Sequence, residues 1–465
     1  MRQTGASTPA SRTGELRLSV LLTAAVMVVV AATHWPVLSA GAVSLDDTEF
    51  LFQNPVIQKP GWASARQILT EVVSSSTVAG YYEPLTLISL MVDVALGGRI
   101  DNLRPFHRTS LALHVLNTAL VIVLVYMLFG PRARAVGGAA KVSRRGGADG
   151  DSPGRRWVWI AAGSGLLFGL HPLTVEPVAW VWERKTLLAA FFGLGCLIFY
   201  TAYARGGRRT WYAAALIAYV LAVMAKPTAT PLAAAMLLLD YWPLARLDRR
   251  ALREKAPFFA VAVVSAVITV LSTQRTASVV MPGVYYSFGQ LPLRVGYLLM
   301  FYLYKVLWPV RLSSVYVMPQ SWSLREAPVC GGLAGACVLA ALAVYALRRT
   351  RAFLTGGLFF LVVLSPTLGV VGYSWVVASD KYVYLPATGL VLILAWLLGV
   401  LREAASRRSS GMLLTAGGVA VVLAAAGAEA FLARAYLVHW RDTVSLYRHM
   451  LTLAPGAASV HANLG

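Results

Sequence analysis

The sequence predicts an all-α polytopic membrane protein, and three features of the chain support this fold class. Hydrophobic residues make up 58% of its 465 positions, charged residues only 13%, and the mean hydropathy is +0.65. Soluble globular chains carry about 25% charged residues. Apolar runs of roughly the 20 residues that a spanning helix needs recur along the whole chain.

We predict about eleven spanning helices, with the cationic loops between them on one side of the membrane. The positive-inside rule then explains the formal net charge of +21. Nucleic-acid binding is not expected, because no basic stretch alternates with stacking aromatic residues. In this orientation residues 1–16 are cytoplasmic. The predicted spans are residues 17–36, 106–129, 157–176, 186–204, 211–226, 228–244, 257–273, 328–347, 353–372, 386–401 and 411–432.

Two apolar segments do not fit this alternation as spans. Residues 81–98 are short and contain two carboxylates and a proline. A crossing by residues 291–309 would put basic loops on both sides. We therefore assign both segments to the outer interface, where Tyr and Trp are common. A topology in which both cross keeps the same chain ends, and it stays open as an alternative.

The first apolar segment has two interpretations. The sequence SAGA at residues 39–42 offers a signal-peptidase site, but the apolar run before it is longer than a usual signal core. A retained helix instead holds Asp46 and Asp47 in a first outer loop, residues 37–105, at the membrane surface. Adjacent carboxylates repel each other, which favours a raised pKa for one of them.

Residues 433–465 differ in composition from the apolar spans. Trp440, Leu446 and Tyr447, followed by Pro455, predict a helix, a turn and the start of a second helix. This pattern resembles the opening of a tetratricopeptide repeat, which we expect on the outer face. One repeat cannot bury its own apolar face, so the segment would begin a longer array.

Further ionisable and polar residues gather at the outer ends of several predicted helices. Any single one could mark only the point where a helix meets water. Charges at membrane depth are costly, however, so a cluster on one side indicates a functional site. Besides the two aspartates, the set comprises Asn54, His171, Glu176, Glu183, Arg184, Lys185, Lys226, Asp380, Lys381 and Tyr382.

This mixture of carboxylates and cations suits transfer of a group from a phosphorylated lipid. The acceptor needs a base to take its proton, and the departing phosphate needs cations. The adjacent Asp46 and Asp47 favour one raised pKa. Arg184 offers a fork for phosphate oxygens, and Lys185, Lys226 or Lys381 offers a point charge. No ligand spacing demands a metal or another cofactor, although a divalent cation held by the two aspartates stays open.

Six motifs occur in order along the chain. They are LDDTEFLFQNPVI, YYEPLTLISLMVDVALGG, FHRTSLALHVLNTAL, LFGLHPLTVEPVAWVWERKTLLAAFF, MAKPTATPLAAAMLLLDYWPL and SDKYVYLPATGL. Together they resemble the transmembrane and tetratricopeptide-repeat family of protein O-mannosyltransferases, of the GT-C class, and its bacterial relatives. The resemblance implies a GT-C-like catalytic bundle over residues 17–432, in a bacterial inner membrane. It also implies transfer of a sugar, typically mannose, from a polyprenyl-phosphate carrier to a protein hydroxyl on the periplasmic or lumenal face.

The same resemblance implies site roles. The acidic pair of the first outer loop supplies the catalytic base in the GT-C class, and this carries onto Asp46, with Asp47 beside it. The repeats would engage the protein acceptor. Two departures from the family pattern bear on substrate binding, and the first leaves the identity of the sugar open. Glu83 in YYEPL stands where relatives have a cation, and Lys381 in DKYVYLP replaces an arginine and its bidentate fork.

Other functions remain as alternatives. The lipid-linked sugar could pass to a glycan or a lipid instead of a protein. The chain could also be a non-catalytic anchor for a repeat scaffold, or a transporter of a lipid carrier. A transporter would place its charges near mid-membrane on broken helices, often in two repeated halves, and no such halves are visible in the sequence.

Overall fold

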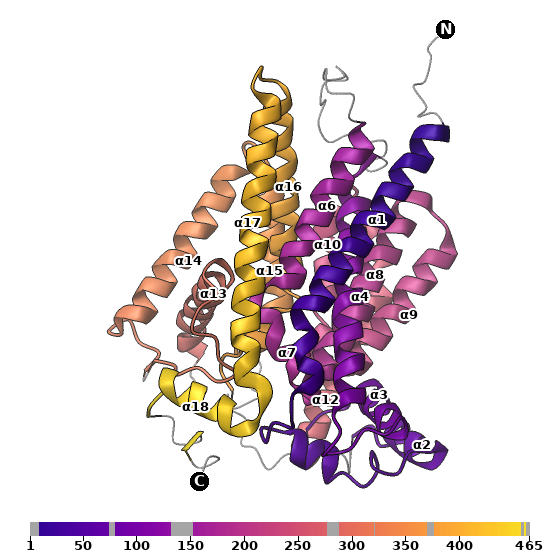
Figure 1. Ribbon diagram of the computed structural model, residues 1–465, viewed down its shortest axis with the longest axis vertical. Coiled ribbons are helices and arrows are strands. Elements are labelled where there is room, and N and C mark those ends of the chain that lie inside the picture. The colour runs from indigo at the N-terminus through magenta and orange to yellow at the C-terminus, as the bar shows by residue number, and fades with distance from the viewer. Residues whose placement is uncertain are drawn as a thin grey trace.

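The chain folds into a bundle of long helices (Figure 1). This computed structural model describes residues 9–73, 80–131, 152–276, 288–319, 321–369, 376–456 and 460–461. The described residues contain helices and no β-strand, so the predicted all-α class is confirmed. The α-helices are α1 (Pro9–His34), α2 (Trp62–Thr70), α3 (Pro84–Ala95), α4 (Arg104–Phe129), α6 (Pro153–Leu170), α7 (Val175–Ala179), α8 (Arg184–Gly206), α9 (Arg209–Ala225), α10 (Leu232–Tyr241), α11 (Arg249–Glu254), α12 (Ala256–Thr276), α13 (Leu291–Leu307), α14 (Ala327–Ala346), α15 (Ala352–Leu364), α16 (Ala387–Ser406), α17 (Gly411–Leu437) and α18 (Thr443–Leu453).

Several of these helices can cross a membrane, so the chain is a multi-pass integral membrane protein. Seven described segments are long and apolar enough, and α6 with α7 adds an eighth candidate that is bent by 57°. Shorter apolar helices include α3 and α9. The count of eleven spans stays a prediction, and part of the predicted span 353–372 lies outside the described residues. The seven segments are Thr13–Ser39, Arg104–Phe129, Val181–Gly206, Arg249–Arg275, Ala327–Ala346, Ala387–Ser406 and Gly411–Arg441.

The connections gather at the two ends of the bundle. The start of α1 and the turn between α16 and α17 lie at the upper end in Figure 1, whereas α2, α3 and α18 lie at the lower end. The sequence predicts the first two on the cytoplasmic side, and they do share one end. Assignment of that end to the cytoplasm stays a prediction. Half of the predicted N-terminal segment, residues 1–8, lies outside the described part, and so does most of the long basic loop, residues 132–151.

The segment HPLTVEPVAWVWERK breaks the helical run inside the bundle. α6 ends at Leu170, since a residue that precedes proline, here His171 before Pro172, is pushed out of the helical conformation. Three short helical pieces, η3 (Pro172–Thr174), α7 and η4 (Val181–Glu183), precede α8. All residues from 172 to 184 are buried. The polar side chains of this segment, such as Glu176 and Glu183, therefore lie in the interior of the bundle.

The first outer loop is hydrogen-bonded to the last described helix. Gly41 N donates to Arg441 O at 2.8 Å, and Ser44 N donates to Thr443 Oγ1 at 3.1 Å across 399 positions of sequence. The Thr443 hydroxyl donates in turn to Ala42 O at 3.2 Å. These bonds fix the loop just before the acidic pair.

α18 is the first helix of the predicted repeat. Asp442 begins it, because its carboxylate accepts a hydrogen bond from Ser445 N at 2.8 Å. Trp440, Leu446 and Tyr447 are fully buried, in agreement with the predicted apolar face. The second helix was predicted to start around Ala462–Gly465, outside the described residues, so the repeat itself stays a prediction.

Candidate functional site

Asp47 is a buried anchor of the first outer loop. It begins the wide helical turn η2 (Asp47–Phe52), and its side chain is 1% exposed. Its Oδ1 accepts a hydrogen bond from Trp182 N at 2.9 Å, and its Oδ2 accepts one from Val43 N at 3.3 Å. Burial raises the pKa of Asp47 to about 7, against the two amide donors that lower it. Asp47 therefore ties the loop to the helix break.

Asp46 lies in a different environment from its neighbour. Its side chain is only partly buried, and its carboxylate accepts no hydrogen bond from any residue that the structure describes. Burial raises the pKa of Asp46, while the ammonium groups of Lys381 and Lys185 oppose the rise. Asp46 is thus a carboxylate of increased basicity that faces two cations and has no fixed donor.

Glu183 is the centre of a buried group of charges. Its carboxylate lies 3.0 Å from Lys226 Nζ and 3.1 Å from Lys381 Nζ, and it accepts a hydrogen bond from Thr186 Oγ1 at 2.5 Å. Lys226 also donates to Thr186 at 2.8 Å. Burial alone would lower the pKa of Lys381, but Glu183 and Glu176 raise it above its ordinary value. The lysine is therefore firmly cationic.

Glu176 holds the segment that carries Lys381. Its Oε1 accepts from Ser379 Oγ at 2.7 Å, its Oε2 accepts from Lys381 N at 3.0 Å, and Lys381 Nζ lies 3.8 Å away. Tyr302 OH accepts a hydrogen bond from Ser379 N at 3.2 Å. Since Glu176 is on α7, the broken helix positions the short turn η9 (Asp380–Val383).

Lys185 completes the cations near Asp46. Its Nζ lies 3.5 Å from Glu83 and 5.0 Å from the ring centroid of Trp182. Burial raises the pKa of Glu83, and Lys185 opposes this. The unexpected carboxylate of the YYEPL motif is therefore paired with a lysine of the ERK motif. We call the set Asp46, Glu83, Glu176, Glu183, Lys185, Lys226 and Lys381 the Glu183 cluster.

A small cavity adjoins two lysines of this cluster. Lys226 and Lys381 line one part of it, and Ala189, Val363 and Leu385 give it apolar walls. A phosphate joined to a hydrocarbon chain has the same combination of polarities. The volume is about 30 Å³, room for about one water molecule. A lipid headgroup would therefore have to move these side chains apart.

Arg184 points away from the Glu183 cluster, toward α3 and α4. Its Nη1 lies 2.8 Å from Asp93 and donates to Ser89 Oγ at 3.0 Å, while its Nε donates to Ser110 Oγ at 3.1 Å. Its Nη2 donates to Phe106 O at 2.5 Å. All three guanidinium nitrogens have internal partners, so these contacts give no support to the predicted phosphate fork. They attach α3 to the bundle.

Two other predicted binding residues, Asn54 and His171, hydrogen-bond mainly to backbone atoms outside the Glu183 cluster. Asn54 is buried, and its Oδ1 accepts from Val56 N at 3.1 Å and from Ile57 N at 3.4 Å. His171 Nδ1 accepts from Leu173 N at 3.2 Å, and its Nε2 lies 3.0 Å from Val306 O. Both side chains shape turns, and the structure does not bring them into the Glu183 cluster.

Asp380 and Tyr382 flank Lys381 but face different surroundings. Asp380 is buried and accepts hydrogen bonds from Tyr316 OH at 2.5 Å and Tyr436 OH at 3.1 Å. Burial and the nearby Glu176 raise the pKa of Asp380. Tyr382 lines the small cavity. Asp380 therefore joins α17 to η9, and Tyr382 remains beside the lysines.

No arrangement of ligands for a metal is present in the described part of the chain. Within it, no three His, Cys, Asp or Glu side chains are placed to hold a metal ion. Asp47, one of the two residues predicted for this role, already accepts two backbone donors. A divalent cation near Asp46 stays an untested alternative.

Sequence reasoning missed three residues that support the charges. They are Thr186, Ser379 and Tyr302, which bind Glu183, Glu176 and the η9 segment. A signal existed for Thr186, because residues three apart on a helix share a face. Nothing in the sequence indicates the contact of Tyr302, which comes from the distant helix α13.

Comparison with known proteins leaves the site without assigned relatives. No protein-family model matches the chain, and neither a curated protein nor a solved structure is detectably similar to it. The function must therefore be argued from the residues themselves.

Proposed function

We propose that this protein is a membrane glycosyltransferase that moves a sugar from a polyprenyl-phosphate carrier to a hydroxyl of a protein acceptor. The observation that carries the proposal is the position of Asp46. It is a carboxylate with a raised pKa that accepts no hydrogen bond from the described residues, and it lies near Lys185 and Lys381. Lys381 in turn lines the small cavity with apolar walls. A base and a phosphate-binding cation are the two groups that this reaction needs.

In the proposed reaction Asp46 takes the proton of the acceptor hydroxyl as its oxygen attacks the anomeric carbon of the sugar. The bond from that carbon to the phosphate oxygen breaks, and its electron pair leaves with the polyprenyl phosphate. Lys226 and Lys381 stabilise the charge that develops on the phosphate. Asp47 and Glu176 are positioning residues, because they hold the loop and η9 in place.

Mannose as the sugar, and a protein as the acceptor, are supported by the six sequence motifs. The proposed acceptor-binding region is the segment around α18, which hydrogen-bonds to the loop before Asp46. This contact would bring an acceptor held by α18 and by further repeats close to the base. Transfer to a glycan or a lipid would use the same charges.

The test is Asp46→Asn in purified protein, with a polyprenyl-phosphate-linked mannose and an acceptor peptide. We expect turnover to fall by about 10²- to 10⁴-fold, because the variant keeps the shape and loses the base. Carrier binding should persist, since the lysines remain. Glu49→Gln is the matched control, because Glu49 is exposed in the same turn. Full turnover in Asp46→Asn would refute the base assignment.

One observation favours a second candidate, a transporter of a lipid carrier. The bend of 57° between α6 and α7 places a buried carboxylate on a broken helix, as transporters do. The two functions give different results in sealed vesicles. A transporter moves the carrier across the bilayer without an acceptor, whereas a transferase consumes the sugar only when the acceptor is present.

A further inference from the structure

A second cavity, larger than the one beside Lys226 and Lys381, lies at the other end of α8 from Glu183. α8 has 23 residues, so its ends are about 34 Å apart at 1.5 Å per residue. The cavity has a volume of about 260 Å³ and is lined by residues near the end of α8, from the loop after α10 and from α11. This is just below the ~300 Å³ at which ligand pockets usually begin, a size that suits a small polar group.

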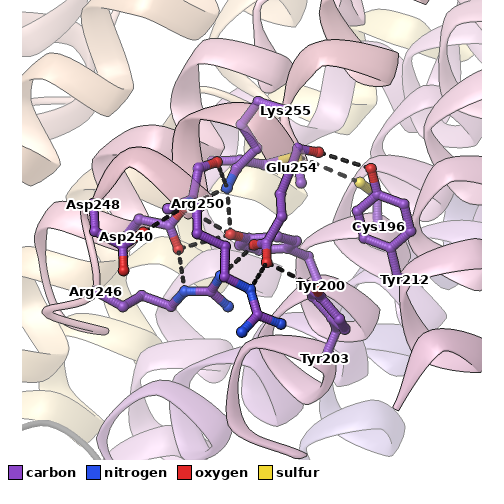
Figure 2. Close-up of polar contacts among 12 residues, drawn as sticks. Cys196, Tyr200, Tyr203, Tyr212, Asp240, Arg246, Asp248, Arg250, Glu254 and Lys255 are labelled. Atoms are coloured by element: carbon purple, nitrogen blue, oxygen red, sulfur yellow. Dashed lines mark hydrogen bonds and ion pairs between the residues drawn. The ribbon is translucent and has the colours of Figure 1, made fainter. Parts of the chain in front are cut away.

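A network of charged and polar side chains lies beside the cavity, and Figure 2 shows it. Lys255 and Asp240 form a fully buried ion pair, and the Tyr200 hydroxyl donates to both oxygens of Asp240 at 2.8 and 2.6 Å. Arg246 lies 3.6 Å from Asp240 and also pairs with Glu254. We call these five residues the Asp240 cluster. Its groups satisfy one another and hold Arg246 at the cavity wall.

The cavity wall carries more positive than negative charge. Arg205, Arg246 and Arg250 line it against two carboxylates, Asp248 and Glu254. The Asp248 carboxylate caps α11, because its Oδ1 accepts a hydrogen bond from Ala251 N in the first turn of that helix at 2.7 Å. Glu254 is shared between Arg246 and Arg250. Among the described residues, Arg205 has no ion pair, so the wall has an excess cation.

Further exposed arginines near the cavity add to this excess of positive charge. Arg250 contacts Glu254 through Nε alone, and its side chain is 77% exposed. Gly207, with φ of 66°, ends α8 and turns the chain beside Arg205. The surrounding arginines are exposed and form no ion pair with described residues. They are Arg208, Arg209, Arg249 and Arg253.

The neighbouring helix indicates where the ligand comes from. Only 11% of the apolar window of the segment Arg249–Arg275 is buried in the protein, so lipid chains would cover most of α12. The cavity adjoins the first turns of this segment and therefore lies at the level of lipid headgroups. Basic pockets between membrane helices at this level are suited to anionic headgroups.

We propose that this cavity binds the phosphate of an anionic phospholipid from the adjoining leaflet. Arg205 and Arg250 donate to the phosphate oxygens, and the acyl chains continue along the exposed face of α12. The bound lipid would stabilise the packing of α8, α10 and α12 from the end opposite the Glu183 cluster. This site is independent of the proposed transferase reaction.

The experiment uses the full chain in neutral detergent, titrated with dioleoyl phosphatidylglycerol, and follows thermal unfolding. We expect saturable stabilisation, with the half-saturating lipid concentration raised about tenfold by Arg205→Gln, since a charge-assisted hydrogen bond is lost. Glu254→Gln should lower that concentration, because it removes the internal competitor for Arg250. Arg408→Gln, at an exposed arginine between α16 and α17, is the control and should change nothing.

Two further titrations identify the source of the phosphate. Dioleoyl phosphatidylcholine, which carries no net charge, should not stabilise the protein in an Arg205-dependent way. Inorganic phosphate alone should act only at far higher concentration. Equal stabilisation by phosphatidylcholine, or an equal loss in Arg408→Gln, would overturn the proposal. Arg205-dependent stabilisation by inorganic phosphate with none by phosphatidylglycerol would overturn the lipid assignment. Arg205→Lys, which keeps the charge, separates a binding defect from a folding defect.

Discussion

The two ends of α8 carry two buried groups of charge that differ in one respect. In the Asp240 cluster the central carboxylate accepts hydrogen bonds from Tyr200 and Lys255 and faces Arg246. Its hydrogen-bonding capacity is used within the protein. In the Glu183 cluster, Asp46 lies beside Lys185 and Lys381 and accepts no hydrogen bond from the described residues. The carboxylate of Asp240 is therefore fully engaged by its neighbours, whereas the carboxylate of Asp46 accepts no hydrogen bond from the described residues.

This difference separates a structural role from a chemical one. A buried ion pair with all its partners present stabilises the fold mainly because removing one partner leaves an uncompensated charge. A basic carboxylate that has no fixed donor can accept a proton from a ligand. Burial and charge alone therefore do not identify a reactive carboxylate. The number of hydrogen-bond donors that it already binds distinguishes a structural carboxylate from a reactive one.

The largest expected effect on stability comes from removing the central carboxylate of the Asp240 cluster. Asp240→Asn leaves Lys255 buried without its counter-charge, and we expect a loss of about 3–5 kcal/mol in the free energy of unfolding. Turnover per folded molecule should not change. Unfolding in mixed micelles measures the first quantity and a transfer assay the second. Asp248→Asn is the control, since asparagine also caps a helix. A variant that stayed stable but lost turnover would reverse the two roles.

The next effect concerns the cation beside Asp46. Lys381→Met should lower turnover by about 10²- to 10³-fold, because the developing phosphate charge loses a donor. It should also move the acid limb of the pH–rate profile to higher pH. The reason is that Asp46 acts as a base only when ionised, and Lys381 lowers its pKa. Lys381→Arg keeps the charge and should keep the profile. If the acid limb of the pH–rate profile stayed in place in Lys381→Met, the pH dependence would not come from the ionisation of Asp46.

The smallest effect distinguishes Arg184 from its neighbours. Arg184→Lys cannot reach Asp93, Ser110 and Phe106 at once, so α3 should be held less firmly, at a cost of about 1–3 kcal/mol. The Michaelis constant for the lipid donor should stay near that of the unmodified protein, because Arg184 does not face the cavity. A large rise in that constant with unchanged stability would restore the phosphate role that the sequence predicts.

The sequence allowed the fold class and part of the site to be predicted. Composition and apolar run length are enough for an all-α membrane protein, because a bilayer requires internally bonded helices. Charges at the outer helix ends led to Glu176, Glu183, Lys226 and Lys381, which the structure does bring together. Prolines directly follow Glu176 and Lys226 and gave part of the signal, since they interrupt helices and let side chains enter the interior.

The direction of each side chain was not predictable. Glu183, Arg184 and Lys185 are consecutive, yet they meet Lys226, Asp93 and Glu83 respectively. Neighbours on a helix point about 100° apart, so one motif serves three surroundings. In the same way, Asp47 binds backbone amides while Asp46 does not. Such differences depend on which distant segments pack against each side chain. The sequence of a single motif does not indicate which segments these are.

The hydrogen bonds between the first outer loop and α18 have a consequence for biogenesis. Residues 41–44 are synthesised early, but their partners, Arg441 and Thr443, are 399 or more positions later. Contacts of such sequence separation form slowly and only after the intervening chain exists. The loop that carries Asp46 therefore lacks these bonds while the preceding membrane helices insert, although Asp47 can already bond to Trp182. Its proposed base is fully set in place only after residues 441–443 have been made, so we expect a nascent chain to remain inactive until then.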